Sequence, residues 1–254
     1  PSGLLDGQHE QADQRTAWGG NASQTWLLGE RGFDSEATLG VQFRQDRIDL
    51  GLYQTVDRQR TGVTRLDRVT ENALGIYGEL RSQWQPWLRS SLGLRWDGLR
   101  ASVTPVAGVF NMNNGGSARA SQLSPKLGIV IGPFAGPFST APSTEYFLNW
   151  GRGFHSNDAR GATTRSNVND GSSVATNPLM VQATGSEIGV RTSPLPGWQS
   201  SLTLWQMALD SELIFIGDEG VTEPRGSSHR HGIEWSNYYS NGRGLIVDGD
   251  IAIS

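Results

Sequence analysis

Four polar side chains with binding chemistry lie together where one predicted strand gives way to a polar segment: His155, Asn157, Asp158 and Arg160. An imidazole, an amide, a carboxylate and a guanidinium could contact an incoming polar ligand, because loops on a rigid scaffold commonly carry binding. The same side chains could instead hydrogen-bond the neighbouring backbone and shape the base of a loop. The residue types alone leave both interpretations open.

Two histidines form a second candidate site. His229 and His231 are two residues apart, so they share one face of a strand, and such a pair can bind a metal when another strand supplies a third ligand. The sequence identifies no third ligand, which favours two ordinary rim histidines. It also contains no G-x-S-x-G, no H-E-x-x-H and no phosphate-binding glycine loop at a helix start. We therefore predict no catalytic residue, no metal site, no cofactor and no enzymatic activity.

The composition narrows the class of protein. The 254 residues include 33 glycines and nine tryptophans, only 36% are hydrophobic, the net charge is −4, and there is no cysteine. The charge gives no basic footprint for nucleic acid, so we predict no nucleic-acid partner. No apolar run approaches the ~18 residues of a membrane helix. The wall of a membrane β-barrel suits this composition, because only the lipid-facing half of each strand must be apolar.

The candidate residues follow a predicted strand, Thr144–Asp158, in which Tyr146, Leu148 and Trp150 share one face and Phe147 breaks the alternation. Similar alternating stretches recur along the chain. In order, the ten predicted strands lie at 14–28, 39–44, 74–81, 88–97, 123–131, 144–158, 185–191, 199–210, 233–239 and 245–253. In the eighth strand the apolar face switches near Trp205, which suggests a bulge or the end of the bilayer zone.

The connections between these strands alternate in length. Residues 1–13 have loop composition, and short turns are predicted at 30–35, 83–86, 132–143, 193–198 and 240–244. Long loops are predicted at 47–68, 99–121, 155–181 and 211–228, although parts of the first could extend the flanking strands as a ribbon. Short periplasmic turns and long outer loops are typical of outer-membrane barrels. Aromatic residues near the strand ends also fit an interfacial girdle. The predicted fold is therefore all-β: an antiparallel transmembrane β-barrel fragment of about ten strands, with short periplasmic turns and long extracellular loops.

The charged residues of these strands are predicted to face inward, because an Arg or Lys facing lipid costs roughly 2–4 kcal/mol near the midplane. Inward charges could contact a plug, line a wet lumen or simply make the wall polar. The set with mixed signs is Arg44, Glu79, Arg89, Arg95, Asp97, Lys126, Glu187, Arg191, Asp248 and Asp250.

Several motifs together resemble the barrel of TonB-dependent outer-membrane receptors. They are L-S-P-K-L-G at 123–128, Y-F-L-N-W-G-R-G-F-H-S-N-D-A-R-G at 146–161, G-S-E-I-G-V-R at 185–191, L-T-L-W-Q-M-A-L-D-S-E-L at 202–213 and R-H-G-I-E-W at 230–235. The resemblance implies a 22-stranded barrel in the bacterial outer membrane, closed by a plug that couples to TonB. It also implies uptake of a scarce nutrient, most commonly a ferric siderophore, with cobalamin, haem or carbohydrate on the same scaffold.

The sequence departs from that family pattern, since residues 1–254 contain no plug-like segment and end within a strand. We therefore expect a partial barrel, with the plug and the C-terminal strands absent, in contact with outer-membrane lipid. His155, Asn157, Asp158 and Arg160 lie in the stretch that resembles the family generally, which favours their structural interpretation, because ligand contacts should differ between receptors. The alternatives are a passive porin-like channel or barrel enzyme, and a soluble β-rich binding domain.

Overall fold

The computed structural model describes residues 8–29, 34–136, 139–216 and 221–254, which fold into strands and turns. In the described ranges no helix is long and apolar enough to cross a membrane. The twelve strands are β1 (Gln8–Leu27), β2 (Asp34–Val56), β3 (Gln59–Gln85), β4 (Leu88–Ala107), β5 (Gly116–Gly136), β6 (Ser139–Ser156), β7 (Met180–Leu195), β8 (Trp198–Leu209), β9 (Glu212–Ile216), β10 (Val221–Arg225), β11 (Ser228–Ser240) and β12 (Ile246–Ile253).

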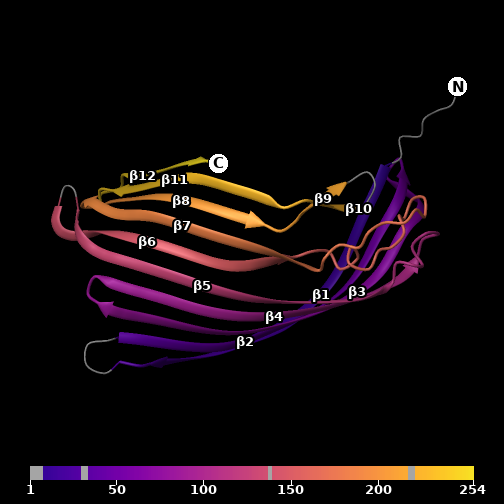
Figure 1. Ribbon diagram of the computed structural model, residues 1–254. Helices are drawn as coiled ribbons and strands as arrows, with labels where there is room; N and C mark the ends of the chain where they lie inside the picture. The colour runs from indigo at the N-terminus through magenta and orange to yellow at the C-terminus, as the bar shows by residue number, and fades with distance from the viewer. Residues whose placement is uncertain (1–7, 30–33, 137–138, 217–220) are drawn as a thin grey trace.

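Ten of these strands form one antiparallel sheet in the order β1-β2-β3-β4-β5-β6-β7-β8-β11-β12. The sheet is strongly twisted and curved, and β1 and β12 are its free edges (Figure 1). The remaining two, β9 and β10, form a separate hairpin within the connection from β8 to β11. The predictions of an all-β fold and of ten consecutive wall strands are confirmed.

The two faces of the sheet differ as the sequence alternation predicts. One face, called the outer face below, carries exposed apolar side chains such as Leu39, Val41, Leu92 and Leu94. The other, called the inner face, carries their alternate neighbours and is covered near one end by residues 157–179, the connection between β6 and β7. Phe147 lies on the inner face because it is the register partner of Gly189, which leaves room for its ring.

A small hydrophobic cluster lies under the connection 157–179. Ala159 and Leu179 from this connection pack with inner-face residues of β2, β3 and β4, among them Ile48, Val69 and Ala101. All of these side chains are almost fully buried. The longest connection predicted from the sequence is therefore real, and it folds back onto the wall.

Two other predicted loops are wrong or too long. Residues 47–68 continue β2 and β3 as a paired ribbon that closes at Asp57 and Arg58, both at positive φ. Most of 99–121 likewise belongs to β4 and β5, which leaves only 108–115 as a connection. In both places paired strands continue well past the apolar band of the outer face, and this continuation had suggested loops because its outward residues are polar.

Two smaller predictions are also corrected. Gln8–Asp13 belongs to β1 and pairs with β2, so this part of the predicted N-terminal loop is strand. The bulge near Trp205 is absent, because β8 keeps unbroken register there with both β7 and β11. The predicted connections at 30–35, 132–143 and 211–228 each include residues outside the described ranges, as do residues 1–7.

Candidate functional site at the loop end of the sheet

The connection 157–179 is closed at its neck by Asn157. This side chain is 8% exposed and its Nδ2 donates a 2.6 Å hydrogen bond to the carbonyl oxygen of Pro178. The backbone N–H of Asn157 donates to the carbonyl oxygen of Leu179 at 3.0 Å. One residue therefore joins the two ends of the connection, as the structural interpretation of the sequence expected.

Asp158 and Arg160 form the first turn inside the connection. The guanidinium donates to both carboxylate oxygens, at 2.6 to 3.1 Å, and the backbone N–H of Arg160 donates to Asp158 Oδ1 at 2.8 Å. Burial raises the pKa of Asp158, but the hydrogen bonds from Arg160 outweigh burial and hold it below its ordinary value. The carbonyl oxygen of Arg160 then accepts a 2.7 Å hydrogen bond from the hydroxyl of Thr164.

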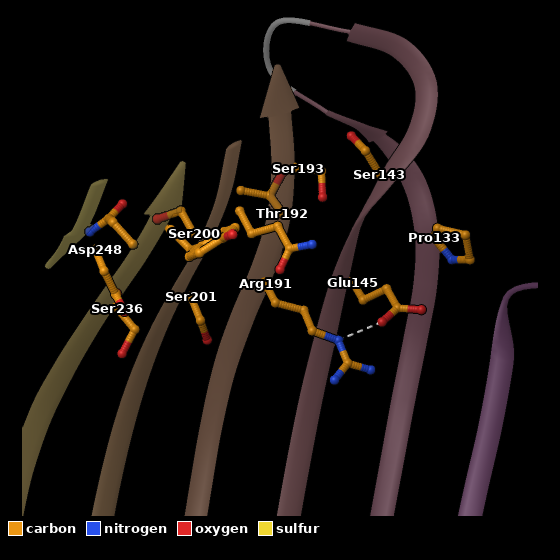
Figure 2. Close-up of a pocket in the computed structure, with 13 residues that line it drawn as sticks. Pro133, Ser143, Glu145, Arg191, Thr192, Ser193, Ser200, Ser201, Ser236 and Asp248 are labelled. Carbon is orange, nitrogen blue, oxygen red and sulfur yellow. Dashed lines mark hydrogen bonds and ion pairs between the residues drawn. The ribbon is translucent and has the colours of Figure 1, made fainter. Parts of the chain in front are cut away.

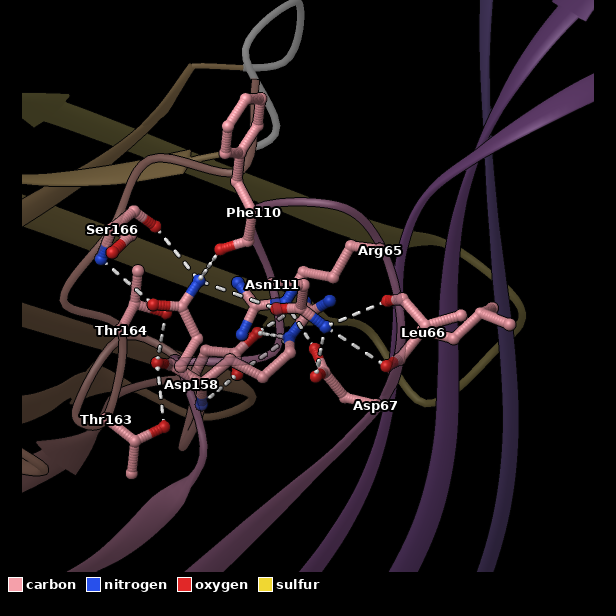
Figure 3. Close-up of polar contacts among 12 residues, drawn as sticks. Arg65, Leu66, Asp67, Phe110, Asn111, Asp158, Thr163, Thr164 and Ser166 are labelled. Atoms are coloured by element: carbon pink, nitrogen blue, oxygen red, sulfur yellow. Dashed lines mark hydrogen bonds and ion pairs between the residues drawn. The ribbon is translucent and has the colours of Figure 1, made fainter. Parts of the chain in front are cut away.

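A buried ion pair on β3 lies beside this turn (Figure 3). Arg65 pairs with Asp67, and the two side chains are only 5% and 0% exposed. Burial lowers the pKa of Arg65, and the nearby Arg160 lowers it further, while Asp67 and Asp158 oppose the shift. Asn111 is fully buried as well, and its Nδ2 donates to Asp67 Oδ1 at 2.9 Å. The paired charges thus join the ribbon of β3 to the connection 108–115.

Asn114 joins the connection 108–115 to the connection 157–179. Its Oδ1 accepts hydrogen bonds from the backbone N–H groups of Arg165 and Ser166, both at 2.9 Å, and its Nδ2 donates to the carbonyl oxygen of Ser166 at 2.9 Å. The side chain is fully buried. From the sequence, N-M-N-N at 111–114 indicated only a loop, so the contacts of Asn111 with β3 and of Asn114 with the connection 157–179 were not predicted. No alternation marks Asn114, because Asn113 is the residue that continues the alternation of Asn111 with Phe110 and Met112.

Of the four residues predicted from the sequence, His155 alone has a free side chain. It lies on the inner face opposite Val181 and is exposed, and its imidazole makes no hydrogen bond within the residues that the structure describes. The polar atoms of Asn157, Asp158 and Arg160 form hydrogen bonds within the connection itself. The four residues are thus together at one corner, where the inner face meets the packed connection.

The charged residues predicted to face inward do lie on the inner face by register. Most are paired across strands or along them. Arg44 pairs with Asp46, Arg95 with Asp97, Lys126 and Arg81 with Glu79, Arg89 and Arg191 with Glu145, and Asn149 donates to Glu187. Eight of the ten residues are therefore paired or hydrogen-bonded, whereas Asp248 and Asp250 of β12 form no ion pair within the described residues.

A pocket of about 530 Å³ lies on the inner face at the opposite end, beside the short turns. Figure 2 shows Glu145 and Arg191 joined across its floor, with hydroxyls of Ser143, Ser200, Ser201 and Ser236 around them. The hydroxyl of Ser143 is buried and makes no hydrogen bond within the described residues. This second inner surface is therefore polar and hydroxyl-rich.

A family model described as "TonB dependent receptor-like, beta-barrel" matches residues 2–249. The chain belongs to the TonB-dependent receptor β-barrels. A comparison with curated proteins gives no match. Barrels of this family lie in the bacterial outer membrane, so the exposed apolar side chains of the outer face of this receptor barrel face lipid. The family and fold are those of receptors and transporters rather than of enzymes.

Solved structures with the same fold are distant in sequence. The siderophore receptor PiuA from Acinetobacter baumannii is 13% identical in sequence and superposes with a TM-score of 0.71. The match covers 95% of this chain and 38% of the PiuA chain. The alcaligin outer-membrane receptor FauA from Bordetella pertussis is 14% identical with a TM-score of 0.63, and the match covers 96% of this chain and 39% of the FauA chain. The copper transporter OprC is 14% identical with a TM-score of 0.64, and the match covers 99% of this chain and 40% of the OprC chain. The chain thus spans about two fifths of the length of these neighbours.

The two histidines of the second candidate site lie on the outer face of the receptor barrel. His229 and His231 lie on this face, because their neighbour Gly232 is the inner-face partner of Trp205. Both histidines are exposed, and no group of three metal-ligating side chains occurs in the described part of the chain. The pair lies on the outer face just beyond Ile233, an exposed apolar residue of β11.

Proposed function

We propose that these ten strands form part of the wall of a larger outer-membrane receptor that takes up a scarce nutrient, and that this nutrient is a ferric siderophore. The match to the receptor-barrel family over 2–249 carries this proposal. Two free sheet edges and coverage of about two fifths of the neighbouring chains support a wall that continues in a longer protein. On this proposal a plug and further strands complete the receptor, and the plug couples it to TonB.

The polar inner face supports a solvated interior with two distinct regions. The serine-lined pocket beside the short turns lies at the periplasmic end, where a plug would meet the wall. The corner around His155 lies at the extracellular end, where a ligand would arrive first. We propose that ligand contact begins at His155, because Asn157 and Arg160 are already committed to holding the connection.

Uptake by a deletion strain tests the function. The strain carrying the full-length gene, the deletion strain and the complemented strain are supplied with one iron-loaded siderophore at a time as the sole iron source. We expect the deletion to abolish uptake of radioactive iron from at least one siderophore, and complementation to restore it. Unchanged uptake from hydroxamate, catecholate and carboxylate siderophores alike would count against iron as the cargo.

A variant series tests the site within that receptor. Replacement of His155 by Ala should weaken binding of the transported ligand while leaving the folded, membrane-inserted amount unchanged. The matched control is His229→Ala, which removes the same side chain from the outer face. Equal affinities for the His155→Ala receptor and the unmodified receptor would remove His155 from the site, without bearing on the uptake function itself.

A further inference from the structure

Two arginines on the outer face lie directly opposite each other. Arg100 of β4 and Arg119 of β5 are register partners, and both are exposed. Their chain neighbours fix the face: Leu99 and Ala101 are buried in the inner cluster, while Ala118 and Ala120 pack against it. Like charges directly opposite on a sheet are destabilising. The pair therefore needs an explanation from its surroundings.

Within the part of the chain that the structure describes, neither Arg100 nor Arg119 has a carboxylate partner. Along the same outward row, the partners on β1, β2 and β3 are Trp18, Gln45 and Asn72, which are neutral. They hydrogen-bond one another, Trp18 to Gln45 at 2.8 Å and Gln45 to Asn72 at 2.7 Å. The next outward row toward the loop end adds a third exposed cation, Arg47, with only Thr and Ser side chains beside it on β1, β3, β4 and β5.

None of these three arginines makes an ion pair within the residues that the structure describes. Arg68, one row further from the apolar band, shows the contrast, because its guanidinium reaches the Asp49 carboxylate at 3.1 Å. Three unpaired cations and no unpaired carboxylate in adjoining rows leave a concentrated positive charge on an otherwise neutral surface.

This charge lies at the upper limit of the lipid-facing surface. The row directly toward the turn end contains Phe43 and Leu74, and the following one contains Val41, Ile76 and Trp96, all exposed and apolar. In an outer-membrane barrel the end with long connections faces outward from the cell. The arginines therefore sit at the headgroup level of the outer leaflet, continuous with the surface that contacts the acyl chains.

We propose that Arg47, Arg100 and Arg119 form a binding site for the phosphate groups of a phosphorylated lipid in the outer leaflet. A guanidinium binds phosphate oxygens in a bidentate manner, and its apolar stem can lie along the hydrocarbon surface while the charge stays at the interface. One phosphate between Arg100 and Arg119 replaces their mutual repulsion with two attractions. The neighbouring Trp18, Gln45 and Asn72 are neutral, so they do not compensate the positive charge of these arginines.

The test compares lipid binding by the full-length receptor and its variants in a neutral detergent. The probe is fluorescent lipid A with two phosphates, set against dephosphorylated lipid A of the same acyl composition. A basic residue near a membrane surface contributes about a fivefold affinity change. We therefore expect Arg100→Gln to weaken binding about fivefold, and Arg100→Gln with Arg119→Gln roughly twenty-fold. The matched control, Arg243→Gln, removes an exposed arginine from the turn between β11 and β12 and should bind normally.

A second readout separates the site from a merely structural role. Without lipid, Arg100→Gln should leave the thermal midpoint unchanged or raise it, because the variant relieves repulsion. With diphosphorylated lipid A the unmodified receptor should gain the larger midpoint increase. Equal binding of both lipids, equal loss in the Arg243→Gln control, or full competition by inorganic phosphate at the lipid's own concentration would each overturn the proposal.

Discussion

Replacing Asn114 by Ala should release the connection 157–179 from the wall. The change removes the three hydrogen bonds of this side chain that reach the connection, to the backbone N–H groups of Arg165 and Ser166 and to the Ser166 carbonyl oxygen. A net contribution of about 1 kcal/mol for each bond gives about 3 kcal/mol. The side chain is fully buried, so the two stranded N–H groups would add a desolvation cost if water could not reach them.

Hydrogen exchange of the full-length receptor measures this loss directly. A reduction of about 3 kcal/mol in the free energy of local opening corresponds to roughly a hundredfold faster exchange for amides that exchange through that opening. The expected site is the peptide that covers 163–177, while peptides from β7 and β8 should keep their protection.

Asn113→Ala is the matched control, because Asn113 is the exposed neighbour of the same tip and has no hydrogen bond recorded for the described residues. Its peptide 163–177 should exchange at the unmodified rate. Exchange within threefold of the unmodified rate in the Asn114→Ala receptor would contradict this prediction, because the hydrophobic cluster and the contacts of Asn157 and Arg160 would then hold the connection without Asn114.

Three further changes test other parts of the wall. Asp67→Asn strips the counter-charge from a buried guanidinium and should cost about 3–5 kcal/mol, seen as faster proteolysis of the extracellular connections; unchanged proteolysis would contradict it. Gly189→Ala places a Cβ 2.6 Å from a carbonyl oxygen of β8 and should lower the folded fraction on a heat-modifiability gel, whereas Gly185→Ala, with nothing nearer than 3.8 Å, should not. Because hydrogen bonds from Arg160 lower the pKa of Asp158 despite burial, this carboxylate stabilises the connection above the unfolded pKa of about 3.8 and stops doing so as pH falls through the lower folded value. Proteolysis of 157–179 should therefore stay constant from pH 7 to 5, and loss within that range would point to another group.

The strand order and the inward direction of the charged residues could be predicted because lipid imposes a simple rule on each strand. Alternate residues must be apolar wherever the outer face meets hydrocarbon, as Leu92, Leu94 and Trp96 are on β4. The rule fails beyond the membrane. There Asp49 and Arg68 point to water, and their polarity made a long paired ribbon resemble a loop.

The asparagine contacts could not be predicted for a different reason. Asn114 joins two connections that are about 50 residues apart in sequence, through its bonds to Arg165 and Ser166. Asn111 reaches back to Leu66 and Asp67 of β3, which are 45 and 44 residues away. A single sequence contains no period or spacing that pairs two such segments. Burial of both amides follows only after 157–179 folds back onto the inner face, which is a tertiary event.

A change in the phase of the apolar residues marks where the membrane ends on each strand. On β2 the apolar positions move from Leu39, Val41 and Phe43, which face outward, to Ile48 and Leu50, which are buried on the inner face. On β4 they move in the same way, from Leu94 and Trp96 to Leu99 and Ala101. Neither switch involves a shift in register between β1 and β2 or between β4 and β5.

The same switch explains β8 without the bulge that the sequence suggested. Leu202 and Leu204 are exposed on the outer face, whereas Trp205 and Met207 belong to the inner face, and the register with β7 and β11 is continuous through them. The apolar residues thus move from the outer to the inner face while the backbone of β8 stays regular, as they do on β2 and β4. Arg47 lies between Phe43, the last outward apolar residue of β2, and Ile48 of the inner cluster. Arg100 of β4 follows the outward Trp96 and lies between Leu99 and Ala101, which are the first cluster residues of its strand. Their position at the headgroup level thus follows from the apolar pattern of their own strands, independently of their charge.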